Sequence, residues 1–242
     1  MSWTDQRSPS WVTGPLAGFD TETTGVDPRH ARLVTAALVI RDGKDTTRTW
    51  LADPGQEIPA AATRIHGIST EYAREHGRPA ADVLSELADE LHRVLKARTP
   101  IVAFNAPYDL EIVERELRRH GLPTLSDRLG DIRPVIDPLV LDRGLVKKRR
   151  GKRRLSNLLY AYGLSLERSF HTAEVDVQAT LDLAQEMARR HPSIASMSLG
   201  ELHAFQQDAH RAWAKNFADF LSRRRGEPVS ICEQWPLPDL DG

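Results

Sequence analysis

The fold of this chain is decided by Phe19-Asp20-Thr21-Glu22-Thr23-Thr24-Gly25, which follows the apolar run Pro15-Leu16-Ala17-Gly18. The pattern predicts a buried strand that ends in a turn at Gly25. Asp20 and Glu22 are two residues apart and therefore lie on one face of that strand. Two carboxylates at a buried strand end repel each other and lose hydration unless a cation lies between them. Mg²⁺ and Mn²⁺ prefer such oxygen ligands. The alternative interpretation is that the two acids belong to a strand end that runs out into a solvated turn.

The composition predicts one ordinary domain with an appendage. The chain has 242 residues, of which 40% are hydrophobic, and its 33 basic and 34 acidic residues leave a formal net charge of −1. Nucleic-acid binding would therefore depend on local basic patches. The single cysteine, Cys232, excludes an intrachain disulfide and a cysteine-based zinc site, and fits a reducing compartment. Without an apolar leader or a stretch long enough to span a bilayer, we expect a cytoplasmic protein with no membrane contact.

Hydrophobic periodicity predicts three antiparallel strands, followed by strands that alternate with helices. Residues 32–40 and 46–51 are expected to form a hairpin through the turn signal Asp42-Gly43. Shorter apolar runs predict strands at 101–104 and 135–137. This order is typical of an α/β protein with a mixed sheet flanked by helices. Helices are expected over residues 59–64, 80–95, 107–120, 139–146, 155–162, 172–190 and 198–225.

The same pattern divides the chain into three segments. Residues 1–14 are polar and are expected to form a flexible arm. Residues 15–191 would form the main domain, and residues 192–242 a C-terminal helix with an extended tail. The apolar content of that helix should pack on something, either on the domain itself or on a partner.

Further acidic and imidazole groups occupy places that packing alone does not explain. Asp109 lies in the first turn of the helix that follows Asn105, where capping is the alternative role. Asp176 falls on an apolar stripe of the helix over 172–190, so it needs a partner. His171 could share a site with Asp176 if it lies in the loop before that helix. Five residues apart within one helix, the two side chains would point about 140° away from each other.

Together, the order Asp-x-Glu, then Asp, then His-x-x-x-x-Asp resembles the DEDD exonuclease superfamily in its histidine-containing branch. The three motifs would be residues 19–25, 105–109 and 171–176. Ile65-His66-Gly67-Ile68 and Leu155-Ser156-Asn157-Leu158 resemble further segments of these proteins. The match covers roughly residues 15–190 and is most similar to proofreading (epsilon) subunits of bacterial DNA polymerase III and their free-standing relatives. The sequence departs from the family pattern at Phe104, Pro107, Tyr108 and Val177, which affects the expected shape of the nucleotide pocket rather than the ligands.

The resemblance implies a ribonuclease H-like fold with a five-stranded mixed sheet. It also implies a metal-dependent 3′–5′ exonuclease that releases nucleoside 5′-monophosphates from single-stranded DNA in proofreading or repair. Two Mg²⁺ or Mn²⁺ ions would be held by Asp20, Glu22, Asp109 and Asp176, with His171 as the general base. The terminal nucleotide would be bound by Thr21, Thr23, Thr24, His66, Phe104 and Asn105.

Two alternative functions are compatible with parts of this pattern. An RNA exonuclease similar to oligoribonuclease or ribonuclease T would share the same ligands. A non-catalytic polymerase-associated subunit is disfavoured because all five positions are present.

Two segments outside the motifs are candidates for contacts with substrate or partners. The basic run at 147–154 is either a solvated loop or a guide for the substrate, with Lys147, Lys148, Arg149 and Arg150 binding phosphates. The C-terminal segment is a candidate for contact with a polymerase, with docking on the domain itself as the favoured alternative. Gln234-Trp235-Pro236-Leu237, followed by Leu240, faintly resembles a sliding-clamp-binding peptide.

Overall fold

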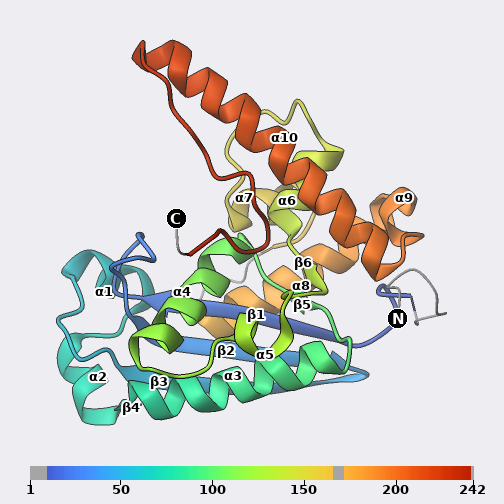
Figure 1. The fold of residues 1–242 in the computed structure, drawn as a ribbon. Helices are drawn as coiled ribbons and strands as arrows, with labels where there is room; N and C mark the ends of the chain where they lie inside the picture. Colours follow the sequence, from blue (N-terminus) through green and yellow to red (C-terminus); the bar gives the residue numbers. More distant parts are fainter. Residues whose placement is uncertain (1–9, 166–171, 241–242) are drawn as a thin grey trace.

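The computed structural model describes residues 10–165 and 172–240 and has a mixed sheet with helices on both faces (Figure 1). Among these residues, six strands form the sheet in the order β4-β3-β2-β1-β5-β6. β1, β2 and β3 are antiparallel neighbours, whereas β5 and β6 run parallel to β1. The strands are β1 Leu16–Thr23, β2 Leu33–Asp42, β3 Lys44–Asp53, β4 Arg78–Pro79, β5 Ile101–Val102 and β6 Val135–Ile136.

The predicted α/β class and mixed sheet are confirmed, with one strand more than expected. The additional strand, β4, pairs in parallel with the end of β3. β4 consists of an exposed Arg and Pro, so it lacks the apolar run that predicted the equally short β5 and β6.

The predicted helices are all present, and three short ones were not predicted, α2, α5 and α9. A helix this short shows little apolar periodicity, and α1 and α7, with seven residues each, were instead predicted from the Pro59 and Gly163 that bound them. The helices are α1 Ala60–His66, α2 Thr70–His76, α3 Ala80–Lys96, α4 Ala106–Arg119, α5 Leu125–Leu129, α6 Pro138–Leu145, α7 Leu155–Ala161, α8 Ala173–Arg190, α9 Pro192–Ala195 and α10 Leu199–Arg225. Within the described part of the chain, none is long and apolar enough to cross a membrane.

The sheet separates two apolar clusters, one with α3 and α4 and one with α7 and α8. On the second side, β1 and α8 approach each other closely because Gly18 has no side chain. A Cβ atom at Gly18 would lie 2.5 Å from Cγ1 of Val177 and 2.8 Å from Cδ1 of Leu181. This contact holds α8 against β1 two residues before Asp20 and so helps to determine where Asp176 lies.

The segment that precedes β1 is described from Ser10 onward. Trp11 is buried, and its Nε1 donates a hydrogen bond of 3.0 Å to the carbonyl of Ile194. The predicted flexible arm at 1–14 therefore carries a buried anchor in its described part, and residues 1–9 lie outside the described residues.

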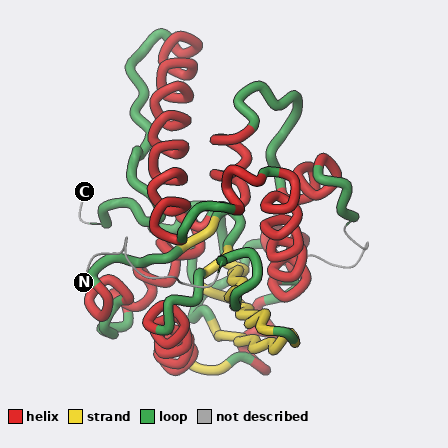
Figure 2. Tube along the Cα trace, turned by 90° about the vertical axis from the view of Figure 1, so that its right-hand side faces the viewer, coloured by secondary structure: helices red, strands yellow, loops and turns green. Residues whose placement is uncertain are grey.

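The base of α10 packs on α6 and β6, and Gln206 completes the sheet edge. Its Oε1 accepts from Asp137 N at 2.6 Å, and its Nε2 donates to Val135 O at 3.0 Å. The distal half of α10 projects from the domain, and the tail runs back beside it (Figures 1 and 2). Trp235, in this tail, is 4% exposed and contacts His203. The predicted clamp-binding peptide thus has its central aromatic residue buried against the domain.

Candidate active site

Three carboxylates converge at the carboxyl end of β1. Asp20 and Glu22 project from one face of the strand, and the first turn of α8 supplies Asp176. One oxygen from each of the three lies within 4.8 Å of the other two. A set of carboxylate oxygens at this spacing suits a hard divalent cation such as Mg²⁺ or Mn²⁺.

Asp109, the fourth predicted carboxylate, is buried in the first turn of α4 beside this cluster. Its Oδ1 accepts hydrogen bonds from Thr21 N at 3.0 Å and from Thr21 Oγ1 at 2.6 Å. These bonds hold Asp109 against β1, where its charge acts on Asp20 and Glu22. Asp109 therefore lies next to the cluster, but the tight cluster itself consists of Asp20, Glu22 and Asp176.

Burial and mutual repulsion raise the pKa values of two members of the cluster, Asp20 and Glu22. The pKa of Asp20 is held well above its ordinary value. Burial is the largest cause, followed by the charges of Asp109, Glu22 and Asp176. Burial, then the charges of Asp176 and Asp109, raise the pKa of Glu22 to about 7. A bound divalent cation would reverse this penalty, because it favours the ionised carboxylates.

His171 lies outside the described residues, so its predicted role as a general base stays a prediction. The structure does begin α8 at Ala173, with Thr172 as the N-cap residue whose Oγ1 accepts from Val175 N at 3.4 Å.

A cavity of about 610 Å³ adjoins the carboxylates. The end of β1, α1 and the start of α4 form its walls. Five residues predicted to hold the nucleotide line it: Thr21, Thr23, Thr24, His66 and Asn105. Phe104 is not among the lining residues; it packs against the apolar cluster on the α8 side of the sheet.

Several residues that line this cavity were not among the predicted binding residues, and Val26, Ile65 and Tyr108 are the most informative of them. Val26 and Ile65 line it with side chains that are 92% and 58% exposed. Tyr108 fixes the turn after β1, because its hydroxyl donates to the carbonyl of Gly25 and lies 2.5 Å from Thr23 Oγ1. The sequence signal for Val26 was an apolar residue directly after the turn glycine.

Asp137 positions the loop that carries Asn105. Asn105 has a φ of 65°, in the left-handed region, and its N–H donates to Asp137 Oδ1 at 3.1 Å. Ala106 N donates to Asp137 Oδ2 at 3.0 Å. Asp137 is fully buried and directly follows β6, so it ties the end of that strand to the start of α4.

The basic run contains two kinds of residue. Arg149 and Arg153 form ion pairs with the buried Asp142, which also accepts a hydrogen bond from the hydroxyl of Tyr162 at 3.2 Å. Lys147, Lys148 and Arg150, by contrast, are exposed. Arg149 was predicted to bind substrate phosphates, but the structure commits its guanidinium to Asp142.

The sequence profile of the family described as Exonuclease matches residues 17–184. The chain belongs to this exonuclease family. Membership confirms the predicted superfamily and the prediction that the chain is an enzyme that hydrolyses phosphodiesters in nucleic acid. The matched residues span the sheet from the second residue of β1 onward and include the convergent carboxylates.

Several relatives share part of the chain. A DNA polymerase III subunit epsilon-like protein from Rhodobacter capsulatus is 31% identical over 191 residues, which are 75% of this chain and 24% of that protein. The DNA polymerase III subunit epsilon of Treponema pallidum is 27% identical over 178 residues, covering 73% of this chain and 77% of the relative. The chain therefore spans about a quarter of the Rhodobacter protein's length and most of the Treponema protein's.

Solved structures share the fold. Exonuclease I from Methylocaldum szegediense superposes with a TM-score of 0.61 at 24% identity, covering 87% of this chain and 45% of that one. E. coli exonuclease I in complex with a dT13 oligonucleotide gives 0.59 at 21% identity, over 74% of this chain and 42% of the other. These neighbours support the ribonuclease H-like fold predicted from the sequence.

Proposed function

We propose that this exonuclease removes nucleotides one at a time from the 3′ end of single-stranded DNA, with divalent metal ions held by the carboxylate cluster. The observation that carries the proposal is the convergence of Asp20, Glu22 and Asp176 beside a cavity of about 610 Å³. Carboxylates held this close repel one another unless a cation is bound between them. The adjoining cavity has the size of a small-molecule binding site. The relatives named as polymerase epsilon subunits, and exonuclease I bound to an oligonucleotide, support the same substrate class.

Each residue has a distinct part in this mechanism. Asp20, Glu22 and Asp176 would bind the ions, and Asp109 would add a fourth carboxylate next to them. Two bound ions would activate a water and stabilise the leaving 3′ oxygen. Thr21 fixes Asp109 through its two hydrogen bonds and thereby sets the position of this carboxylate relative to β1.

The cavity offers both apolar and polar contacts for the terminal nucleotide. Val26 and Ile65 present exposed aliphatic side chains that can pack on a base. Thr23, Thr24 and Asn105 bring hydroxyl and amide groups to the same cavity. A nucleotide needs this combination of apolar surface and a few polar groups.

His171 would accept the proton of the attacking water. Replacing His171 by Ala should lower kcat by ~10²–10⁴ while Mn²⁺ affinity stays nearly unchanged, because a general base transfers a proton without binding the ion. Isothermal titration of Mn²⁺ into both proteins makes the distinction. A comparable weakening of ion binding in the variant would make His171 a ligand.

The direction and product of cleavage test the proposal as a whole. Oligo(dT) labelled at its 5′ end should shorten by single steps in Mg²⁺ and release dTMP, whereas EDTA should stop the reaction. Asp20→Asn serves as the inactive control, and oligo(rU) of equal length measures preference for DNA. Shortening from the 5′ end, or release of larger fragments from the interior, would contradict the proposal, and faster degradation of oligo(rU) would assign the enzyme to RNA.

A further inference from the structure

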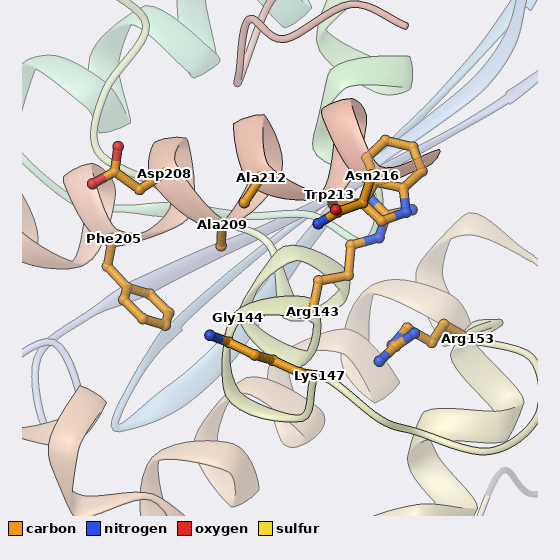
Figure 3. Close-up of a pocket in the computed structure, with 10 residues that line it drawn as sticks. All are labelled: Arg143, Gly144, Lys147, Arg153, Phe205, Asp208, Ala209, Ala212, Trp213 and Asn216. Atoms are coloured by element: carbon orange, nitrogen blue, oxygen red, sulfur yellow. The ribbon is translucent and has the colours of Figure 1, made fainter. Parts of the chain in front are cut away.

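A second hollow lies away from the carboxylates, between α6, the start of the basic run and α10 (Figure 3). It has a volume of about 450 Å³. Gly144, Phe205, Ala209, Ala212 and Trp213 form much of its apolar wall. The small residues Gly144 and Ala209 allow α6 and α10 to approach closely at its base, since a Cβ atom at Gly144 would lie 3.0 Å from that of Ala209.

An aromatic ladder continues from this hollow along the projecting half of α10. Trp213, Phe217 and Phe220 are spaced four and three residues apart, so they lie on one face of the helix. The rings of Trp213 and Phe217 are nearly parallel, with centroids 5.4 Å apart, and those of Phe217 and Phe220 are 6.4 Å apart. Phe217 and Phe220 are 36% and 49% exposed. A row of exposed aromatic rings is unfavourable in water and marks an interaction surface.

Positive charges stand at both ends of the ladder. At the hollow, the guanidinium of Arg143 lies 3.5 Å from the ring centroid of Trp213 (Figure 3), and Lys147 adds a second cation at the rim. Arg153 also lines the hollow, but its guanidinium is paired with Asp142. Burial lowers the pKa of Arg143 to about 10, so this residue is still a cation at neutral pH. At the far end, the exposed Arg223, Arg224 and Arg225 form the last turn of α10.

The balance of charge along the ladder distinguishes between classes of partner. From Trp213 to Arg225 the sequence has four basic residues and one acid, Asp219. Lys215 forms an ion pair with Glu233 of the tail at 3.5 Å, so the positive charge of this stretch comes mainly from Arg223, Arg224 and Arg225. Asp208 is the acid at the hollow. The whole chain, in contrast, is almost neutral. Aromatic rings flanked by cations are the pattern that binds unpaired bases and their phosphates, because every base has a face for stacking and every nucleotide a negative charge.

We propose that this α10 surface, formed by the hollow and the aromatic ladder, binds single-stranded nucleic acid. Bases would stack on Phe217 and Phe220, and phosphates would lie near the cations at either end. This inference rests on the proposed function: the strand bound here would be the part that lies upstream of the 3′ end in the active site. A duplex would not satisfy the rings, since its bases are already stacked on one another.

A second binding surface for the same strand has a consequence that can be measured. Once the 3′ end is bound, the upstream bases meet the α10 surface at a high effective concentration, so long strands gain affinity that short ones lack. The affinity should therefore rise with strand length beyond what the active site alone can accommodate.

The test uses the full chain and the double variant Phe217→Ala/Phe220→Ala. Both side chains are exposed, so the melting temperature should be retained. Tyr160→Ala is the matched control, because Tyr160 is 86% exposed on α7 and does not line the hollow. Binding of fluorescein-labelled oligo(dT) of about 20 nucleotides, and of a trinucleotide, is measured by anisotropy in Ca²⁺. We expect the double variant to bind the long strand about tenfold more weakly or worse, with Tyr160→Ala and the trinucleotide unaffected.

Equal affinity of wild type and double variant for the long strand would overturn the inference and leave the ladder as a protein-binding surface. The experiment also distinguishes failure of this inference from failure of the proposed function. If the long strand binds through the ladder but is never shortened in Mg²⁺, the surface is supported and the exonuclease proposal fails. If the strand is degraded and the double variant retains the wild-type KM for it, the exonuclease proposal stands and the surface does not.

Discussion

Two groups of carboxylates in this molecule have opposite surroundings. Asp142 is fully buried and meets two guanidinium groups, those of Arg149 and Arg153, together with the hydroxyl of Tyr162. Asp20, at the end of β1, is surrounded by Glu22, Asp109 and Asp176, which raise its pKa further above the value set by burial. One carboxylate has protein cations as partners, and the other has further carboxylates.

This difference separates a structural role from a functional one. Glu114 behaves like Asp142: it is buried, and its two oxygens accept from Leu125 N and Ser126 N at 2.6 and 3.3 Å. Burial of an acid is thus common in this chain and does not by itself indicate a site. Crowding by like charges does, because it costs stability unless a cation that the chain does not supply is bound there.

The largest expected effect is on catalysis. Asp20→Asn removes one charge from the cluster and should lower the rate of oligo(dT) shortening by at least roughly a hundredfold, as for removal of other single electrostatic stabilisers. The melting temperature in EDTA should stay the same or rise, because a repulsive interaction is relieved. Wild-type activity in this variant, or a clear drop in stability without metal, would remove Asp20 from the proposed site.

The reverse is expected at Asp142. Asp142→Ala should lower the free energy of unfolding by about 3 kcal/mol, because it leaves two arginines without their buried partner. The remaining folded protein should shorten oligo(dT) at nearly the wild-type rate at a temperature well below its midpoint. Urea denaturation gives the first quantity and an activity assay the second. If Asp142→Ala were as stable as wild type yet inactive, Asp142 would belong with the functional acids.

The motifs found in the sequence predicted the cluster well because each acid has a local anchor. Asp20 and Glu22 follow from the two-residue period of a strand, and Asp176 follows from the start of a helix. The mixed sheet was predictable because its long strands have local signals: β1 and β2 contain apolar runs, and the turn residues Asp42-Gly43 mark the boundary between β2 and β3.

Contacts between distant segments could not be predicted. Nothing local in the basic run indicates that Arg149 turns inward to Asp142 while Lys148 stays exposed. The contact of Trp11 with Ile194 joins residues 183 positions apart, and a polar composition around Trp11 predicted a loose arm. The role of Tyr108 in fixing the turn at Gly25 likewise depends on how α4 packs beside β1.

A smaller effect concerns pH. The pKa of Glu22 is raised to about 7, mainly by burial and then by Asp176 and Asp109, whereas in the unfolded chain it returns to an ordinary value. Between these two values the folded state binds the extra proton, so this contribution to stability is full at low pH and is lost as pH rises through about 7. In EDTA, Glu22→Gln should therefore match wild type near pH 4 and melt at a higher temperature near pH 8. A difference in melting temperature between Glu22→Gln and wild type that stays constant across that pH range would contradict the crowding of Glu22.

The smallest effect concerns the exposed part of the basic run. The triple variant Lys147→Ala/Lys148→Ala/Arg150→Ala should flatten the salt dependence of oligo(dT) binding, by about 0.7 in log–log slope for each phosphate that the variant no longer neutralises. Arg149→Ala is the control, and it should lower stability through Asp142 with little change in slope. A common slope for the triple variant and wild type would make these residues a solvated loop.

Titration calorimetry of Mn²⁺ tests the central distinction between the two groups of acids most directly. Wild type, Asp20→Asn and Asp142→Asn are titrated at one pH and temperature, after removal of metal and a check that each protein is folded. We predict that Asp20→Asn binds Mn²⁺ at least about tenfold more weakly than wild type, since one ligand charge is removed, and that Asp142→Asn binds it like wild type. Equal Mn²⁺ binding by wild type and Asp20→Asn would contradict the account.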